Sequence, residues 1–314
     1  MKSLNALSFL AASLSGVAFN KIGFDTPDLG VHYLSAPYVY RRPDGMDEEQ
    51  FCEYLIEEFE QKVAEVGPEN LAAFFAEPIM GMGGVLVPPA GYFKRIAEIC
   101  RTNEMLIIAD EVVTGFCRLG EFFASESIFE MDPDFISTAK GLTSGYLPMG
   151  ATLISDRVYD VIAQPYADGA MFTHGFTYSG HPICCAAALK NIEIMEKEDL
   201  CSRVRETGSY FVKRLKGLLD LPLIGDVRGM NFMVGLESVG NKETKELLPA
   251  EVNVGARVAK HARAQGLILR PLGHFNVLSP PLILNEEQID EMVAIIRISF
   301  EATQDELVRE GLWS

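Results

Sequence analysis

A continuous apolar run that ends in two acidic residues, Met105-Leu106-Ile107-Ile108-Ala109-Asp110-Glu111, is the most informative stretch of the sequence. An uninterrupted apolar run of this length is typical of a central parallel strand, because helices cover both of its faces. A second short strand is predicted at residues 135–138, and Ala139-Lys140-Gly141 follows it directly. Strands that alternate with helical segments at this spacing predict an α/β fold with a mostly parallel sheet.

Periodic segments on both sides of these strands extend the prediction to two domains. Before residue 199, the pattern predicts helices at 47–66, 91–103 and 182–196, and further strands at 71–75 and 150–154. After residue 199, it predicts helices at 204–219, 252–265 and from 285 onward, and strands at 231–236, 267–269 and 276–278. We therefore expect a large α/β domain over residues 1–198 and a smaller α+β domain over residues 199–314.

The last of these helices carries the clearest local signals. Asn285 is a good N-cap, and Gln288 stands three residues later, where a capping box places its second partner. Apolar residues recur at helical spacing after this cap and predict one buried face: Ile289, Met292, Val293, Ile296 and Phe300.

Composition restricts the classes of function that fit the chain. Its 314 residues carry 27 Lys and Arg against 44 Asp and Glu, a net charge of −17, which disfavours nucleic-acid and anionic-membrane partners. No apolar run reaches the roughly 18 residues of a membrane span. The six cysteines form no C-x-x-C pair, and the five histidines form no zinc-type grouping, so reduced thiols and no metal are expected. The composition favours a cytoplasmic enzyme that acts on small molecules.

Asp110 and Lys140 stand directly after two predicted strands, 30 residues apart. Because one β-α-β step separates them, both are expected at the carboxyl edge of the same parallel sheet, where such folds bind ligands. A lysine amine can form a Schiff base with pyridoxal phosphate, and a carboxylate can keep the pyridine nitrogen protonated. Taken singly, the aspartate also fits a helix cap or a metal ligand, and the lysine also fits a solvated loop.

Several short motifs, in the right order along the chain, resemble those of the class-III aminotransferases, which are pyridoxal-phosphate enzymes of fold type I. The most specific is residues 174–182, which read HGFTYSGHP. The other matching pieces are residues 76–84 (AEPIMGMGG), 106–112 (LIIADEV), 115–120 (GFCRLG), 133–134 (PD), 138–141 (TAKG), 227–229 (VRG) and 269–270 (LR). The resemblance covers nearly the whole chain.

The resemblance implies a role for five residues that match family motifs. It implies that Lys140 forms the Schiff base and carries the proton, and that Asp110 pairs with the pyridinium nitrogen. It implies that Val112 packs on one face of the ring and that Thr177 holds the cofactor phosphate of the neighbouring subunit, which makes a homodimer part of the active site. Glu77 is expected to support Asp110, and a plain buried carboxylate is an equal alternative.

The resemblance also implies a reaction and a substrate-binding residue. Arg270 matches the mobile arginine that holds a substrate carboxylate, and a surface salt bridge is the alternative. The form of residues 174–182 resembles the amine–pyruvate branch, which implies amino transfer from an amine or ω-amino acid to a 2-oxo acid, with pyruvate expected. The alternatives are an aminomutase or racemase on the same scaffold, and a catalytically impaired or non-catalytic truncated homologue.

The N-terminus is expected to lack a segment that family members carry. In those proteins this segment supplies the first strand, part of the small domain, a phosphate-binding turn and a Tyr-His-Gly motif. Residues 11–16 match the stretch that comes shortly after that motif in the family, but Leu4-Asn5-Ala6-Leu7 stands in place of the motif itself. Residues 1–18 also imitate a secretory signal, and we interpret them as an interior piece exposed by truncation.

Overall fold

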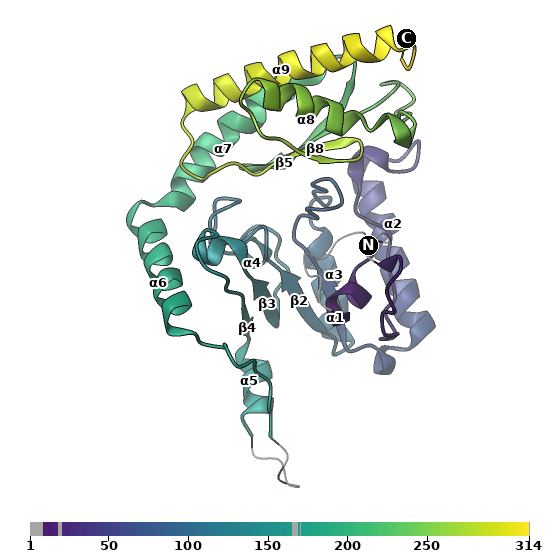
Figure 1. Cartoon of the computed structure of the whole chain (residues 1–314). Helices are drawn as coiled ribbons and strands as arrows, with labels where there is room; N and C mark the ends of the chain where they lie inside the picture. The colour runs from purple at the N-terminus through teal and green to yellow at the C-terminus, as the bar shows by residue number, and fades with distance from the viewer. Residues whose placement is uncertain (1–8, 18–20, 165–168, 170, 314) are drawn as a thin grey trace.

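Two separate sheets organise the chain in a computed structural model that describes residues 9–17, 21–164, 169 and 171–313 (Figure 1). The first sheet has strand order β1-β2-β3-β4 and the second has order β5-β6-β8-β7. In Figure 1 the second sheet and its helices lie above the first sheet, and α6 runs down the side of the molecule opposite α2.

The first sheet is mostly parallel, as predicted. Its strands are β1 (Ala73–Ala76), β2 (Leu106–Asp110), β3 (Phe135–Thr138) and β4 (Ala151–Ile154). Strands β1, β2 and β3 pair in parallel, whereas β4 pairs antiparallel with β3. The connection from β3 to β4 contains only a short 3₁₀ helix, η4 (Lys140–Thr143), and turns. Because no crossover helix carries the chain back across the sheet, β4 returns in the opposite direction.

Helices α2 (Glu48–Val66) and α3 (Tyr92–Thr102) share an apolar core with the parallel strands. Asp47 and Gln50 form a capping box at the start of α2, which agrees with the predicted helix from residue 47. Further short elements are α1 (Phe9–Leu14), α4 (Ala124–Ser127), α5 (Asp156–Ile162), η2 (Val39–Arg41) and η3 (Pro68–Asn70). Helices α4 and α5 were not predicted, because each is too short for helical periodicity to be distinctive.

The second sheet is antiparallel throughout. Its strands are β5 (Ile224–Met230), β6 (Met233–Ser238), β7 (Arg270–Leu272) and β8 (Phe275–Leu278). The helices of this half are α7 (Leu200–Lys216), α8 (Val254–Ala264) and α9 (Glu286–Arg309), with the 3₁₀ helices η5 (Gly217–Asp220) and η6 (Ala250–Val252). Helix α6 (Pro182–Lys197) precedes them and packs on the loop and turn around Phe116 and Leu142. The predicted domain division after residue 198 falls between α6 and α7 and stays a prediction.

The strand predicted at 267–269 is wrong in position, because β7 lies at Arg270–Leu272. Leu267 donates its backbone N–H to the Ala262 carbonyl and so completes the end of α8. The hairpin register, in which Leu272 pairs with Phe275, then fixes β7 three residues later than the apolar pattern indicated. By contrast, the predicted cap and buried face of α9 are both confirmed.

The apolar N-terminal segment is partly described. Ser13, Ser15 and Val17 are buried, whereas Leu10 is exposed, and the interpretation of this segment as an interior piece exposed by truncation stays a prediction. The residues that stand in place of the Tyr-His-Gly motif, 4–7, lie outside the described residues. Within the described ranges, no helix combines the length and the apolar character that crossing a membrane requires.

Candidate functional site

The carboxyl edge of the parallel sheet carries three side chains that the sequence singled out. Glu77 follows β1, Asp110 ends β2, and Lys140 begins η4 just beyond β3. The ladder pairs Ala76 with Ala109 and Asp110 with Ser137, so the backbone alone fixes these three positions side by side. We call Glu77, Asp110 and Lys140 the lysine edge.

Lys140 is exposed on one side, yet the surrounding protein removes enough water from its ammonium group to lower its pKa. The carboxylates of Asp110 and Glu77 oppose this shift, and the Arg270 guanidinium adds to it. Charge interactions weaken with distance, so these three groups act on Lys140 from its neighbourhood at the sheet edge. Lys140 also has a φ of 38°, a left-handed backbone conformation that tight turns impose on it.

Asp110 is held rigidly within the lysine edge. Its side chain is only 3% exposed, and its Oδ1 accepts a hydrogen bond of 3.0 Å from the backbone N–H of Val112. This contact turns Val112 back toward the strand end, where it lines the same cavity as Lys140. A buried, oriented carboxylate next to a small apolar side chain suits a flat, positively charged ring.

Glu77 orders the glycine loop formed by residues 81–84. Its Oε2 accepts a hydrogen bond of 3.0 Å from the backbone N–H of Gly81. The Sδ atom of Met82, in the same loop, accepts a hydrogen bond of 3.2 Å from Nη2 of Arg270. The glycine loop therefore connects the lysine edge to the first residue of β7.

Arg270 is exposed and, within the described part of the chain, forms no ion pair with a carboxylate. The surface salt bridge that the sequence left as an alternative is therefore absent there. Its guanidinium remains able to take a carboxylate in a bidentate manner.

A cavity of about 900 Å³ opens beside Lys140. This volume lies within the range of small-molecule and cofactor sites. Its walls come from both halves of the chain and include Val112, Phe116, Tyr146, Asn191 and Ile283. The cavity offers the Lys140 amine and an apolar wall, and the buried Asp110 carboxylate acts on that amine from the neighbouring strand end, a set of groups that fits pyridoxal phosphate.

Thr177 is not brought to this cavity. It lies in an exposed turn before α6, within residues 171–183, which we call the aromatic segment. In this segment Phe172, Phe176 and Tyr178 are each more than half exposed. In a single chain, Lys140 and Val112 line the cavity, Asp110, Glu77 and Arg270 act electrostatically on Lys140, and Thr177 is in neither group.

Asn191 is a site residue that the sequence analysis missed. From α6, its Nδ2 donates to the carbonyl oxygens of Gly141 (2.8 Å) and Leu142 (3.1 Å), and so fixes the turn that carries Lys140. The polar residues of α6 also include Lys190 and Glu193, so the sequence carried no distinctive signal for Asn191.

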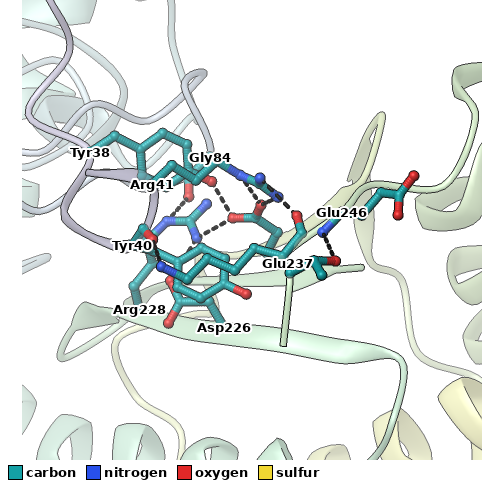
Figure 2. A network of polar contacts seen from close by, with 10 residues as sticks. Tyr38, Tyr40, Arg41, Gly84, Asp226, Arg228, Glu237 and Glu246 are labelled. Carbon is teal, nitrogen blue, oxygen red and sulfur yellow. Dashed lines mark hydrogen bonds and ion pairs between the residues drawn. The ribbon is translucent and has the colours of Figure 1, made fainter. Parts of the chain in front are cut away.

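A buried charge network, also missed, supports the glycine loop from the second sheet (Figure 2). Arg228 donates its Nε to the Gly84 carbonyl at 2.8 Å and its Nη1 to Glu237 at 2.6 Å. Glu237 is fully buried and also accepts hydrogen bonds from Arg41, at 2.7 Å from Nε, and from the Tyr38 hydroxyl. Glu237, a charged residue directly after the strand predicted at 231–236, was the available signal.

The charges in this network are matched. Burial lowers the pKa of the Arg228 guanidinium, but the neighbouring carboxylates of Glu237 and Asp226 outweigh burial and raise it. Burial also raises the pKa of the Tyr38 hydroxyl, which keeps it protonated as a donor. Matched buried charges hold Gly84 in place without leaving an unpaired carboxylate.

Comparison with known proteins places this geometry in a family. The model of the family "Aminotransferase class-III" matches residues 8–299. The chain is 39% identical to "Uncharacterized aminotransferase y4uB" of Sinorhizobium fredii over 99% of its own length and 67% of the relative's. It is 42% identical to "Putrescine–pyruvate aminotransferase" of Pseudomonas aeruginosa over 89% of its own length and 60% of the relative's.

A solved structure agrees with the sequence relatives. The ω-transaminase of Pseudomonas jessenii in complex with PMP superposes with a TM-score of 0.91 at 38% identity, covering 96% of this chain and 66% of that one. The chain thus spans about 60–67% of the length of these relatives. The resemblance read from the motifs is confirmed: the chain belongs to the class-III aminotransferases.

Proposed function

We propose that this chain carries the catalytic residues for aminotransferase activity that moves an amino group from an amine or ω-amino acid to a 2-oxo acid, with pyruvate as the acceptor. The observation that carries the proposal is that Lys140 lines the cavity while Asp110, Glu77 and Arg270 all act electrostatically on its ammonium group. Class-III aminotransferases use pyridoxal phosphate, which supplies an electron-withdrawing ring that stabilises a carbanion at the substrate carbon.

Lys140 provides both a nucleophile and a proton carrier in this proposal. The loss of solvent around its ammonium lowers the pKa, so the neutral amine forms at a lower pH than in an ordinary lysine. Nζ lies on a turn fixed by Asn191, which limits the positions from which it can take up or deliver a proton.

Asp110 and Val112 orient the ring in this proposal. The Asp110 carboxylate, fixed by its hydrogen bond from Val112, would hold a proton on a bound pyridine nitrogen through a charge-assisted contact. Val112 would pack against one face of the ring and keep water away from it.

Arg270 would bind the carboxylate of the 2-oxo acid. It is the first residue of β7 and contacts Met82 of the glycine loop, with no carboxylate paired to it in the described ranges. An exposed arginine attached only to a thioether can move, which suits a residue that must accept both charged and uncharged substrates.

We also propose a homodimer in which Thr177 of one subunit serves the cavity of the other. The support is the aromatic segment, whose exposed apolar side chains form a contiguous run of sequence around Thr177. Exposed patches of this kind mark protein–protein contacts.

We further propose a cytoplasmic location for this enzyme. The acidic net charge of the chain and its scattered free thiols favour that location.

The experiment that tests the lysine assignment is a covalent one. The chain is mixed with pyridoxal phosphate and divided: one portion is reduced with borohydride before any amine is present, and the absorbance spectrum of the other is read before and after addition of an amine. We expect the reduced pyridoxyl group on Lys140 in the wild-type chain, and no pyridoxyl group on the corresponding peptide of Lys140→Ala. The matched control Lys94→Ala removes an exposed lysine paired with Glu130 and should keep the signal.

Two rival functions predict different results. A non-catalytic subunit would bind no cofactor alone and would become active only when mixed with a complete homologue. An aminomutase or racemase would label Lys140 but would not exchange amino groups between two different substrates.

A further inference from the structure

Two cysteines that lie 84 residues apart in sequence meet in the fold. The Sγ atoms of Cys117 and Cys201 are 2.9 Å apart, and all six cysteines, which lie in the described ranges, are free. A disulfide requires about 2.05 Å between the sulfurs, so a movement of less than about 1 Å separates this pair from a bond.

The backbone holds both thiols in position for this contact. Cys117 is fully buried in the loop of residues 115–120 and has a φ of 65°, a conformation that side-chain-bearing residues rarely adopt. Cys201 lies in the first turn of α7, after the N-cap Asp199. Arg205, one turn later, donates to the Gly120 carbonyl and fastens α7 to the same loop.

We propose that Cys117 and Cys201 form a redox modification site, which a small-molecule disulfide such as oxidised glutathione converts into an intramolecular disulfide. The proposal does not depend on the aminotransferase activity.

The chemistry proceeds by two exchanges. The Cys201 thiol loses its proton to solvent, and the thiolate attacks the reagent disulfide, forming a mixed disulfide and releasing one reagent thiolate. Cys117 then loses its proton and its sulfur attacks Sγ of Cys201, releasing the second reagent thiolate. Both thiolates take up a proton, so the two protein thiols are oxidised and one reagent disulfide is reduced to two thiols.

The environments of the two sulfurs set this order. Cys201 is the one that solvent reaches, while Cys117 is fully enclosed. Burial raises the pKa of both thiols, but at Cys201 the neighbouring Cys117 and Arg205 counteract part of the effect. The helix N-terminus also favours a thiolate at Cys201.

The disulfide would close a covalent ring that includes Lys140. Phe116, the neighbour of Cys117, packs so closely on Gly141 that a Cβ built there would meet its Cβ at 2.8 Å. A bond at Cys117 therefore restrains a loop that touches the turn of Lys140, and it ties that loop to α7.

Peptide mapping of the whole chain tests the proposal. The folded chain is incubated with oxidised glutathione, the remaining thiols are alkylated after denaturation, and trypsin releases residues 102–118 and 198–203 as separate peptides. We expect these two peptides to be joined, to separate on reduction, and to be the dominant linked pair. Recovery of both peptides unlinked, or equal linkage to Cys52, Cys100, Cys184 or Cys185, would overturn the proposal.

Two variants sharpen the result. In Cys117→Ser we expect Cys201 to retain glutathione as a stable adduct, because the second exchange has lost its thiol. In the control Cys184→Ser/Cys185→Ser, which removes two partly exposed thiols on α6, the yield of the linked pair should not change. If Cys117→Ser does not fold, the peptide map of the wild-type chain still shows whether Cys117 and Cys201 are the dominant linked pair.

A urea-unfolded wild-type chain provides a further control. It should lose the preference for the Cys117–Cys201 pair, and an unchanged preference would contradict a modification site that the fold creates.

Discussion

The lysine edge and the aromatic segment differ in how much of a site one chain completes. The lysine edge consists of residues at the ends of three neighbouring strands, so the hydrogen-bonded ladder fixes their spacing. The aromatic segment lies in a turn and carries Thr177 among exposed rings. A sheet edge thus assembles its chemistry alone, whereas an exposed turn contributes only when another surface covers it.

The largest expected effect comes from removing the amine of the lysine edge. Lys140→Ala should lower the rate of amino transfer between an amine and pyruvate by about 10²- to 10⁴-fold, the usual contribution of a positioned acid–base group. The fall is measured as the turnover rate at saturating pyridoxal phosphate. Lys94→Ala is the matched control, and a Lys140→Ala chain of unchanged rate would contradict the assignment.

Replacing the fixed carboxylate should have the next largest effect. Asp110→Asn keeps the shape of the side chain and its hydrogen bond to Val112 but removes the charge. We expect turnover to fall by about 10²- to 10³-fold, as when a preorganised electrostatic contact is lost. The KM for the amine should change less than kcat. An equal loss in Glu121→Gln, which removes an exposed carboxylate elsewhere, would indicate a general charge effect instead.

A substitution in the aromatic segment should weaken dimer association and leave the stability of the monomer almost unchanged. Phe176→Ser removes an exposed ring whose burial in a dimer is worth about 1.5–3 kcal/mol, so the dimer dissociation constant should rise about tenfold or more. The urea midpoint of the monomer should shift little, because surface substitutions change stability by less than about 0.5 kcal/mol. Sedimentation equilibrium measures the association. Tyr54→Ser on α2 is the control. An equal change of the dimer dissociation constant in both variants would mean that the aromatic segment has no special part in the dimer contact.

The smallest expected effect is a difference in pH dependence between two lysines. The pKa of Lys140 is lowered by loss of solvent, whereas that of Lys94 is raised by its hydrogen bond to Glu130. Acylation by acetic anhydride requires the neutral amine, so Lys140 should react at lower pH than Lys94, and peptide mapping follows both. Between the folded and the unfolded pKa of Lys140, the unfolded chain binds more protons, so this residue makes stability rise with pH. The reverse order of reactivity would contradict the environment described for Lys140.

Much of the lysine edge could be predicted from the sequence because strand ends are local features. The apolar run before Asp110 and the short strand before Lys140 locate both residues at one sheet edge without knowledge of any distant contact. The cap and apolar face of α9 were predictable for the same reason, since they repeat over neighbouring turns. The direction of β4 and the position of β7 were not, because pairing with another strand fixes them.

Contacts between distant segments were beyond the reach of the sequence. The approach of Arg270 to Met82, the support of Gly84 by Arg228, and the contact of Cys117 with Cys201 join residues 188, 144 and 84 positions apart. Each depends on how the second sheet and α7 pack against the first sheet. Local periodicity carries no information about that packing.

Short-range patterns in the sequence were enough to identify the family, the parallel sheet and the two residues that stand at its carboxyl edge, because motifs and apolar runs are properties of neighbouring residues. Tertiary packing was needed to show which groups surround Lys140, that Thr177 stays outside the cavity, and that two thiols face each other. These facts arise from long-range contacts, where burial and desolvation are set by segments that the chain brings together when it folds.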